Sequence, residues 1–195
     1  MKPASHGAAP LEAGRVLPSG RQVEIRHGDL AAVVTEVGAG LRTLSKGSWE
    51  ILDGYPPDRL CQAGRGQLLL PWPNRLRDGR YQLAGQTRQL ALTEPEKGHA
   101  IHGLTRYASW ALLESGASSC QLGYLLHPEP GYDFTLHVSV EYRLADDGLR
   151  VRVSARNLGL APAPYAAGAH PYLRLDDRGV DGWLLRAPAR VTMAE

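Results

Sequence analysis

Two histidines have the residue type and the setting for proton-transfer chemistry. His102 lies in Ala-Ile-His-Gly-Leu and His170 lies in Gly-Ala-His-Pro-Tyr-Leu. Each ends a strand-like run and stands in turn-forming sequence, a placement that suits a reactive group better than a packed one. The unperturbed pKa of an imidazole, about 6.5, lets it give or take a proton near neutral pH. We therefore interpret the two histidines as a pair that serves one reaction.

Residues 68–76 form a second candidate segment with the character of a rigid binding loop. An apolar strand runs into Trp72, which stands between two prolines, and then into Asn74 and Arg75. Prolines fix the backbone, an indole offers a flat apolar face for a sugar ring, and an amide beside a guanidinium offers donors for hydroxyls. The alternative is a stiffened strand end with Trp72 packed inside and Arg75 in solvent. The two interpretations have about equal weight from this segment alone.

Metal and nucleophile chemistry find little support. His99 and His102 are three residues apart, and on an extended strand such residues point to opposite faces, so no shared metal is expected. The sequence has no Gly-x-Ser-x-Gly motif. Cys61 and Cys120 lie far apart and match no metal or redox spacing, which favours reduced packing residues in a cytoplasmic protein.

Composition narrows the class of protein. The 22 basic and 20 acidic residues give a net charge of +2 without a basic cluster, so nucleic acid is a poor candidate partner. No apolar run is long enough to cross a bilayer, and the first ten residues lack the apolar stretch of a signal peptide, so no membrane partner is expected. The 195 residues fit one domain, with residues 1–10 expected to be flexible.

The elements that must position these residues are strands. Residues 135–157 alternate apolar and polar side chains on both sides of an Asp-Gly turn, which predicts a long hairpin. The 22 glycines and 14 prolines leave no sustained helical stripe. The fold class is therefore all-β, a large antiparallel β-sandwich. Further strands are predicted at 22–26, 31–36, 41–45, 81–83, 90–92, 110–113 and 121–126.

Three motifs in this order are specific to one family. Pro-Trp-Pro-Asn-Arg-Leu-x-x-Gly-x-Tyr, then Ile-His-Gly, then Gly-x-His-Pro-Tyr-Leu resemble the aldose 1-epimerases, or galactose mutarotases, over about residues 20–190. The resemblance implies a two-sheet sandwich that interconverts the α and β anomers of free hexoses, and it implies no cofactor. The expected partner is a small-molecule sugar.

The resemblance also assigns roles. His170 matches the general acid that protonates the ring oxygen, His102 matches the second histidine at that oxygen, and Arg75 matches a substrate-binding arginine. Asn74 is added as a hydroxyl ligand, and Trp72 and Tyr172 are added as walls of the pocket.

One part of the family pattern has no counterpart. The family's general base is a glutamate near its C-terminus and an aspartate binds sugar hydroxyls before it, whereas this sequence covers roughly the first two-thirds of a family domain and Glu195 follows no matching motif. The nearest loop carboxylates are expected to be solvated surface charges: Glu94, Glu96, Glu129 and Asp133.

The sandwich is therefore expected to be incomplete, with unpaired edges or another chain beside them. A shortened gene, a split protein and a homodimer all stay open. So do two other functions, carbohydrate binding without turnover and 1-epimerisation of hexose 6-phosphates. The second would need several arginines on one side of the pocket, which Arg75, Arg77 and Arg106 permit but do not require.

Overall fold

The computed structural model describes residues 16–177 and 179–186, so the expectation for residues 1–10 falls outside the described part. Almost every regular element in it is an antiparallel strand, which confirms the predicted all-β class. The elements are β1 (Gln22–His27), β2 (Leu30–Thr35), β3 (Leu41–Lys46), β4 (Trp49–Glu50), β5 (Leu68–Leu69), β6 (Arg75–Arg77), β7 (Arg80–Leu83), β8 (Gln86–Gln89), the 3₁₀ helix η1 (Pro95–Lys97), β9 (His99–Ile101), β10 (Ala111–Ser115), β11 (Ser119–Leu126), β12 (Leu136–Ala145), β13 (Gly148–Asn157) and β14 (Gly168–Ala169).

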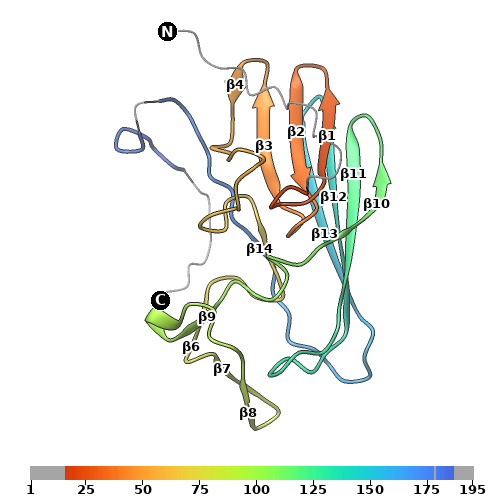
Figure 1. Cartoon of the computed structure of the whole chain (residues 1–195), viewed down its shortest axis with the longest axis vertical. Coiled ribbons are helices and arrows are strands. Elements are labelled where there is room, and N and C mark those ends of the chain that lie inside the picture. Colours follow the sequence, from red (N-terminus) through yellow and green to blue (C-terminus); the bar gives the residue numbers. More distant parts are fainter. Residues whose placement is uncertain (1–15, 178, 187–195) are drawn as a thin grey trace.

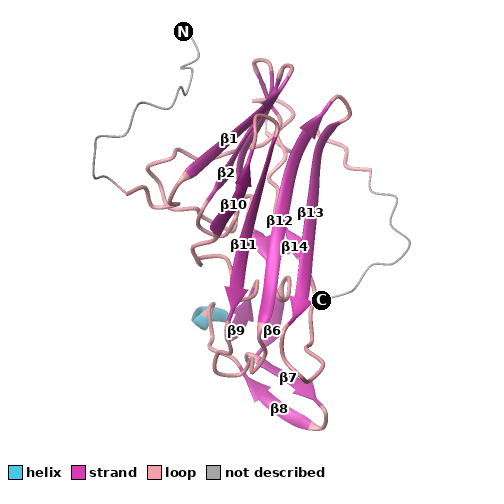
Figure 2. Cartoon of the chain, turned by 90° about the vertical axis from the view of Figure 1, so that its right-hand side faces the viewer, coloured by secondary structure: helices cyan, strands magenta, loops and turns pink. Residues whose placement is uncertain are grey.

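Two four-stranded sheets form the body of the molecule, with strand orders β1-β2-β3-β4 and β10-β11-β12-β13. Figure 1 and Figure 2 show the two sheets as separate layers. Strand β1 contacts both β11 and β12, so the inner faces of the sheets meet there. The core between them includes the fully buried side chains of Ile25, Val34, Trp110, Leu122, Val140 and Tyr142.

The hairpin of β12 and β13 has the predicted turn and an uneven burial. Along β12 the side chains alternate between buried and less buried, as expected for a strand with one face in the core. The apolar face of β13 is covered less well, and Val151 is 43% exposed. The reason is position, because β13 is the last strand of its sheet within the described residues.

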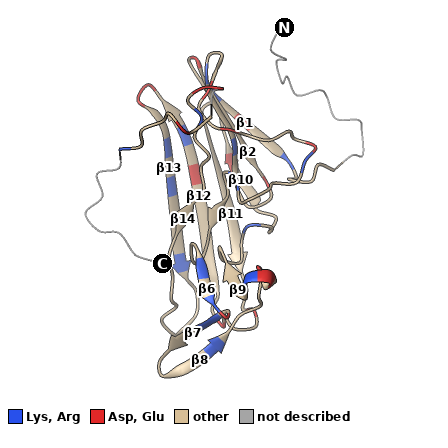
Figure 3. Ribbon diagram, turned by 90° about the vertical axis from the view of Figure 1, so that its left-hand side faces the viewer, with Lys and Arg blue, Asp and Glu red and all other residues tan. Residues whose placement is uncertain are grey.

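The outer strand β13 also carries a stripe of positive charge. Arg150, Arg152 and Arg156 alternate with small or apolar residues along it, and Figure 3 shows this strand as a line of basic segments. Pairing with β12 sets Arg152 opposite Glu141. The face of β13 that carries these arginines turns away from the core.

A smaller hairpin lies below the sandwich in Figure 1. Strand β7 starts where the sequence predicted, but the second strand is residues 86–89 and not 90–92. Ala84 and Gly85 alone make the turn, both with positive φ, so the chain reverses earlier than a three-residue turn would allow. Leu90, predicted to lie in the strand, is instead buried in the core.

Short strand pairs join the candidate site to the sandwich. β14 pairs with β5, which sets Ala169 opposite Leu68, and β6 pairs with β9, which sets Arg75 opposite Ile101. A parallel bridge joins Leu70 to Gly103. These pairings bring together segments that are distant in the sequence. Within the described ranges, no helix is long and apolar enough to span a membrane.

Candidate functional site

His102 and Asn74 meet through two hydrogen bonds between the ends of β9 and β6. The backbone N–H of Asn74 donates to Nδ1 of His102 at 3.0 Å, and the backbone N–H of His102 donates to the carbonyl oxygen of Asn74 at 3.0 Å. Both residues have positive φ, 59° for Asn74 and 62° for His102. Asparagine tolerates this backbone region, but histidine adopts it rarely and at a cost. The ring of His102 is thus held in place by an unusual local backbone.

The residue after His102 explains why the chain turns so tightly. Gly103 is buried, has φ of 75°, and a Cβ at this position would lie 1.9 Å from the carbonyl oxygen of Leu70. Only glycine permits that approach. The contact continues in a hydrogen bond of 2.7 Å from the N–H of Leu104 to the same oxygen. Close backbone packing therefore fixes the chain beside His102.

The surroundings of His102 determine its protonation. Burial lowers its pKa to about 4, and the positive charge of Arg106 and the neighbouring His170 add to the effect. Because Nδ1 accepts the N–H of Asn74, the single proton of the neutral ring is on Nε2. At neutral pH His102 therefore presents an uncharged N–H donor.

His170 lies beside His102 and is held by the segment that precedes β5. Its backbone N–H donates to the carbonyl oxygen of Gln67 at 3.1 Å, and its carbonyl accepts the N–H of Gly66 at 2.8 Å. The rings of His170 and His102 meet edge to face with centroids 5.5 Å apart. The structure thus brings together the two histidines that the sequence analysis paired.

Tyr172 forms one side of this cluster, next to His170. Its ring stacks on that of His170 with centroids 5.1 Å apart and an interplanar angle of 17°. The guanidinium carbon of Arg65 lies 4.5 Å from the Tyr172 ring centroid, in cation–π range. Tyr172 thus lies beside His170, and its role as a wall of the pocket stays a prediction. Arg65 adds a cation that the sequence analysis did not assign to the site.

A second arginine lies close to both histidines. A Cβ at Gly64 would lie 3.6 Å from Cδ2 of His170 and 3.8 Å from Nη1 of Arg106, so both side chains border the same glycine. The carbonyl oxygen of Arg106 accepts a hydrogen bond of 2.8 Å from the buried side-chain amide of Gln67. Gln67 thereby connects the backbone of His170 to that of Arg106.

Arg75 is oriented by a carboxylate. Its Nε and Nη2 donate to the two oxygens of Glu94 at 2.6 and 3.0 Å, and its Nη1 is 3.4 Å from Oδ1 of Asn74. The Arg75 hydrogen bond is the largest cause that lowers the pKa of Glu94, to about 2, and Lys97 contributes as well. Asn74 therefore lies beside His102, and Arg75 lies next to Asn74.

Trp72 has a different environment from the one predicted for a pocket wall. It packs against the hydrophobic core and its ring centroid is 6.5 Å from that of Tyr132. Its indole Nε1 is buried without a hydrogen-bond partner in the described structure. These contacts favour the alternative in which Trp72 packs inside, and its role as a sugar platform stays a prediction.

The loop carboxylates nearest to the site have mixed positions. Asp133 is paired with Arg88 at 2.5 Å, and Glu96 is exposed in η1. Glu94 was expected to be in solvent, but its side chain is only 14% exposed because Arg75 and Lys97 cover it. A carboxyl with a pKa near 2 is a weak proton acceptor at neutral pH. Glu195 lies outside the described residues.

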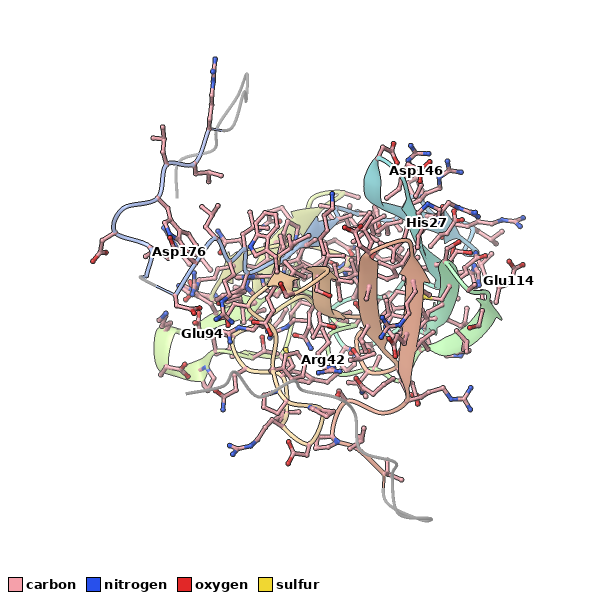
Figure 4. The ribbon with its side chains drawn as sticks, turned by 90° about the horizontal axis from the view of Figure 1, so that it is seen from above. His27, Arg42, Glu94, Glu114, Asp146 and Asp176 are labelled. Carbon is pink, nitrogen blue, oxygen red and sulfur yellow. The ribbon has the colours of Figure 1, made fainter. Side chains whose placement is uncertain are left out.

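Other titratable groups lie away from the cluster. His27 hydrogen-bonds Asp146 at 2.7 Å, and Figure 4 shows this pair on the opposite side of the molecule from Glu94. In the part of the chain that the structure describes, no group of three or more histidine, cysteine and acidic side chains is placed to hold a metal. Two surface hollows of about 190 and 270 Å³ are lined by residues other than the two histidines.

Sequence reasoning missed one charged residue that borders the site, Arg65. It named Arg106 only for the alternative hexose 6-phosphate function, and it expected Glu94 to be a solvated surface charge. A usable signal was present for one of them, because Gly64-Arg65-Gly66 places an arginine between two glycines of positive φ that come close to other groups. Arg106 and Glu94 have no such local signal. The contact of Glu94 with Arg75 joins residues 19 apart in the sequence, and Arg106 meets His170 only where both side chains border Gly64.

The comparisons with known proteins agree on one family. The family model described as aldose 1-epimerase matches residues 21–192. Two proteins of Escherichia coli K12 are similar in sequence, the uncharacterized protein YihR at 38% identity over 90% of this chain and the uncharacterized protein YphB at 26% over 77%. The chain spans 58% and 51% of their lengths, so it corresponds to little more than half of each.

Solved structures show the same fold. A putative aldose 1-epimerase from E. coli K12 aligns with a TM-score of 0.67 and 25% identity over 80% of this chain and 53% of that one. A GalM/aldose epimerase homologue from C. elegans aligns with a TM-score of 0.70 and 19% identity over 80% of this chain and 51% of that one. In both comparisons the aligned part of this chain covers about half of the solved chain.

Proposed function

This chain belongs to the aldose 1-epimerase family, a family of isomerases, and on that premise we propose that it interconverts the α and β anomers of free hexoses such as galactose and glucose. The observation that carries the proposal is the unequal histidine pair. One imidazole, His102, is a neutral donor with its proton on Nε2, and the other, His170, stands 5.5 Å away. Ring opening requires a proton at the ring oxygen O5. In the proposal one histidine gives that proton and the other donates a hydrogen bond to the same oxygen.

In the proposed reaction His170 gives its proton to the ring oxygen O5 as the C1–O5 bond breaks. The electron pair of that bond stays on O5, while a base removes the proton of the C1 hydroxyl and its electrons form the aldehyde C1=O. Rotation about C1–C2 and closure on the other face give the other anomer. His102 donates its Nε2–H to O5, where charge develops.

Arg75 and Asn74 are proposed to bind hydroxyls of the same sugar, and Tyr172 to wall the pocket beside His170. The bidentate contact to Glu94 fixes the plane of the Arg75 guanidinium, and a fixed plane gives directed donors. The base is not assigned to a residue of this chain. A homodimer and a cytoplasmic location also remain proposals, and neither is needed for the chemistry described.

Polarimetry of freshly dissolved α-D-galactose and α-D-glucose tests the proposal. The chain should speed the approach to equilibrium above the spontaneous rate, and His170→Asn should lower the acceleration by about 10²- to 10⁴-fold. His137→Asn is the matched control, because His137 is exposed on β12. Full activity in His170→Asn would reject His170 as the acid. A folded chain that binds galactose without acceleration would support carbohydrate binding without turnover.

Arg106 favours a second candidate function, 1-epimerisation of hexose 6-phosphates. That reaction needs several arginines at one side of the pocket. Arg106 lies beside His170 and Arg65 lies over Tyr172, where it also pairs with Asp53 at 3.3 Å. Of the arginines expected for this role, Arg75 is already neutralised by Glu94. A comparison of kcat/KM for galactose and for galactose 6-phosphate distinguishes the two functions. A preference for the phosphate that Arg106→Gln abolishes would select the second.

A further inference from the structure

We infer that Glu94 is a positioning residue, which orients Arg75 and cancels its charge so that the guanidinium binds neutral hydroxyls. This side of the site therefore disfavours sugars that carry an acidic group. The inference rests on the proposed function, because it concerns how the same site recognises a sugar. It adds a residue, Glu94, that the resemblance to the family does not assign.

The backbone of Glu94 is placed by strand pairing and not by chance contact. Its N–H donates to the carbonyl oxygen of His99 at 2.9 Å, and the N–H of His99 donates back to its carbonyl at 3.2 Å. Strand β9 begins at His99 and pairs with β6, which sets Arg77 opposite His99 and Arg75 opposite Ile101. The same framework therefore fixes both Glu94 and Arg75.

The side chain of Glu94 does not cap the short helix that follows it. Glu94 precedes η1 at its N-cap position, where a side chain commonly accepts a hydrogen bond from the helix, but here it makes no such cap. Instead both carboxylate oxygens accept from Arg75, and Oε1 also lies 3.2 Å from Nζ of Lys97. The carboxylate orients and neutralises a guanidinium.

The consequence concerns charge at the sugar. A bidentate carboxylate keeps the planar fork of an arginine directional while cancelling most of its attraction for a second anion. Arg75 with Glu94 thus acts as a set of N–H donors with little net charge, which suits a hydroxyl. A sugar with a carboxylate near Arg75 would therefore gain little attraction from this guanidinium, because its charge is already paired with Glu94.

The test compares D-galactose with D-galacturonate, which has the same ring and a carboxylate at C6. Dissociation constants are measured by NMR titration or calorimetry, so that turnover is not needed. Glu94→Gln should bind galacturonate about tenfold more tightly relative to galactose than the wild-type chain does, since the positive charge of Arg75 is then no longer cancelled by a carboxylate. Glu141→Gln is the matched control, because Glu141 makes a comparable pair with Arg143 on β12.

A double-mutant cycle separates a role through Arg75 from a structural one. In the Arg75→Gln background, Glu94→Gln should leave the ratio of the two constants unchanged, because no guanidinium remains to be released. Should Glu94→Gln not fold, Glu94→Asp, which keeps the charge but shortens the reach, should give a smaller shift in the same direction.

Each outcome decides between the claims. A ratio that stays the same in Glu94→Gln and Glu141→Gln, with galactose bound by the wild-type chain, would overturn the role of Glu94 and leave the proposed function standing. A wild-type chain that binds neither sugar would overturn the proposed function and this inference with it. A shift that persists without Arg75 would overturn the inference and assign the effect to another group.

Discussion

Asn74 and His102 hold each other in left-handed backbone conformations by a reciprocal pair of hydrogen bonds, and one of those bonds ends on the imidazole ring. The arrangement ties a rare backbone state to a single ring tautomer. The hydrogen bond from Asn74 thus fixes the tautomer of the neutral His102 ring, while burial lowers the pKa of that ring.

Acid should destabilise the chain through His102 before it does so through Glu94. The folded-state pKa of His102, about 4, is below the ordinary 6.5, so its stabilising contribution is complete above about pH 6.5 and is lost as the pH falls toward 4. Glu94, with a pKa of about 2, loses its contribution below about pH 4.5. Denaturation by urea at pH 7 and pH 5 therefore isolates His102 from Glu94.

The variant for this measurement is His102→Asn, which tolerates positive φ and can accept the N–H of Asn74 but does not titrate. The wild-type free energy of unfolding should fall by about 1 kcal/mol more than that of the variant between pH 7 and pH 5, after allowance for partial exposure of the ring. Equal losses in both proteins would mean that His102 protonates normally in the fold.

Replacing Arg106 by glutamine should raise the pKa of His102. Burial is the largest cause of the lowered value and Arg106 the next, so removing that charge relieves part of the shift and leaves the rest. The measurement is an NMR titration of the His102 ring. Arg143→Gln, on β12, should leave the titration unchanged, and a similar change in both variants would argue against a direct effect of Arg106.

Two glycines with nearly the same φ should respond differently to alanine. Gly85 (φ 76°) has no other group within 4 Å of the place that an alanine Cβ would take, so Gly85→Ala should cost about 1 kcal/mol through backbone strain alone. Gly103 (φ 75°) adds the clash with the carbonyl of Leu70, so Gly103→Ala should cost about 3 kcal/mol or more. Urea denaturation gives both values, and similar costs would show that the Leu70–Gly103 approach is not tight.

A pair of leucines on β11 tests the sandwich. Leu122 is 0% exposed and Leu125 is 40% exposed, because residues three apart on one strand point to opposite faces of the sheet. Leu122→Ala should therefore cost about 3 kcal/mol of unfolding free energy, and Leu125→Ala less than about 1. A larger loss from Leu125→Ala would place the core on the other face of the sheet.

The long hairpin could be predicted because its signals are local. Leu136, Val138 and Val140 alternate with polar residues, and such a period belongs to a strand with one buried face. The second strand of the β7–β8 hairpin was misplaced because Leu90 is apolar for a different reason, namely burial in the core beyond the strand.

The site could be predicted in its residue types but not in its contacts. His102, His170, Arg75 and Asn74 are marked by motif, and they lie in one region of the structure. The pairs Arg75 with Glu94 and Arg65 with Tyr172 depend on the pairing of β6 with β9 and of β14 with β5, which no local pattern encodes. The role of Trp72 could not be decided from the sequence, because an indole suits both a sugar-binding surface and a packed core.

The arginines of β13 have a consequence for how the molecule behaves when it meets another copy of itself. If two such strands met antiparallel with their apolar faces on the same side, the side chains of one basic face would stand opposite those of the other, and like charges would face each other. Such self-pairing is how exposed strand edges begin to build fibres. Repulsion between the arginines of two copies would oppose such self-pairing. A strand of another protein that carries acidic side chains on the matching face would instead be attracted.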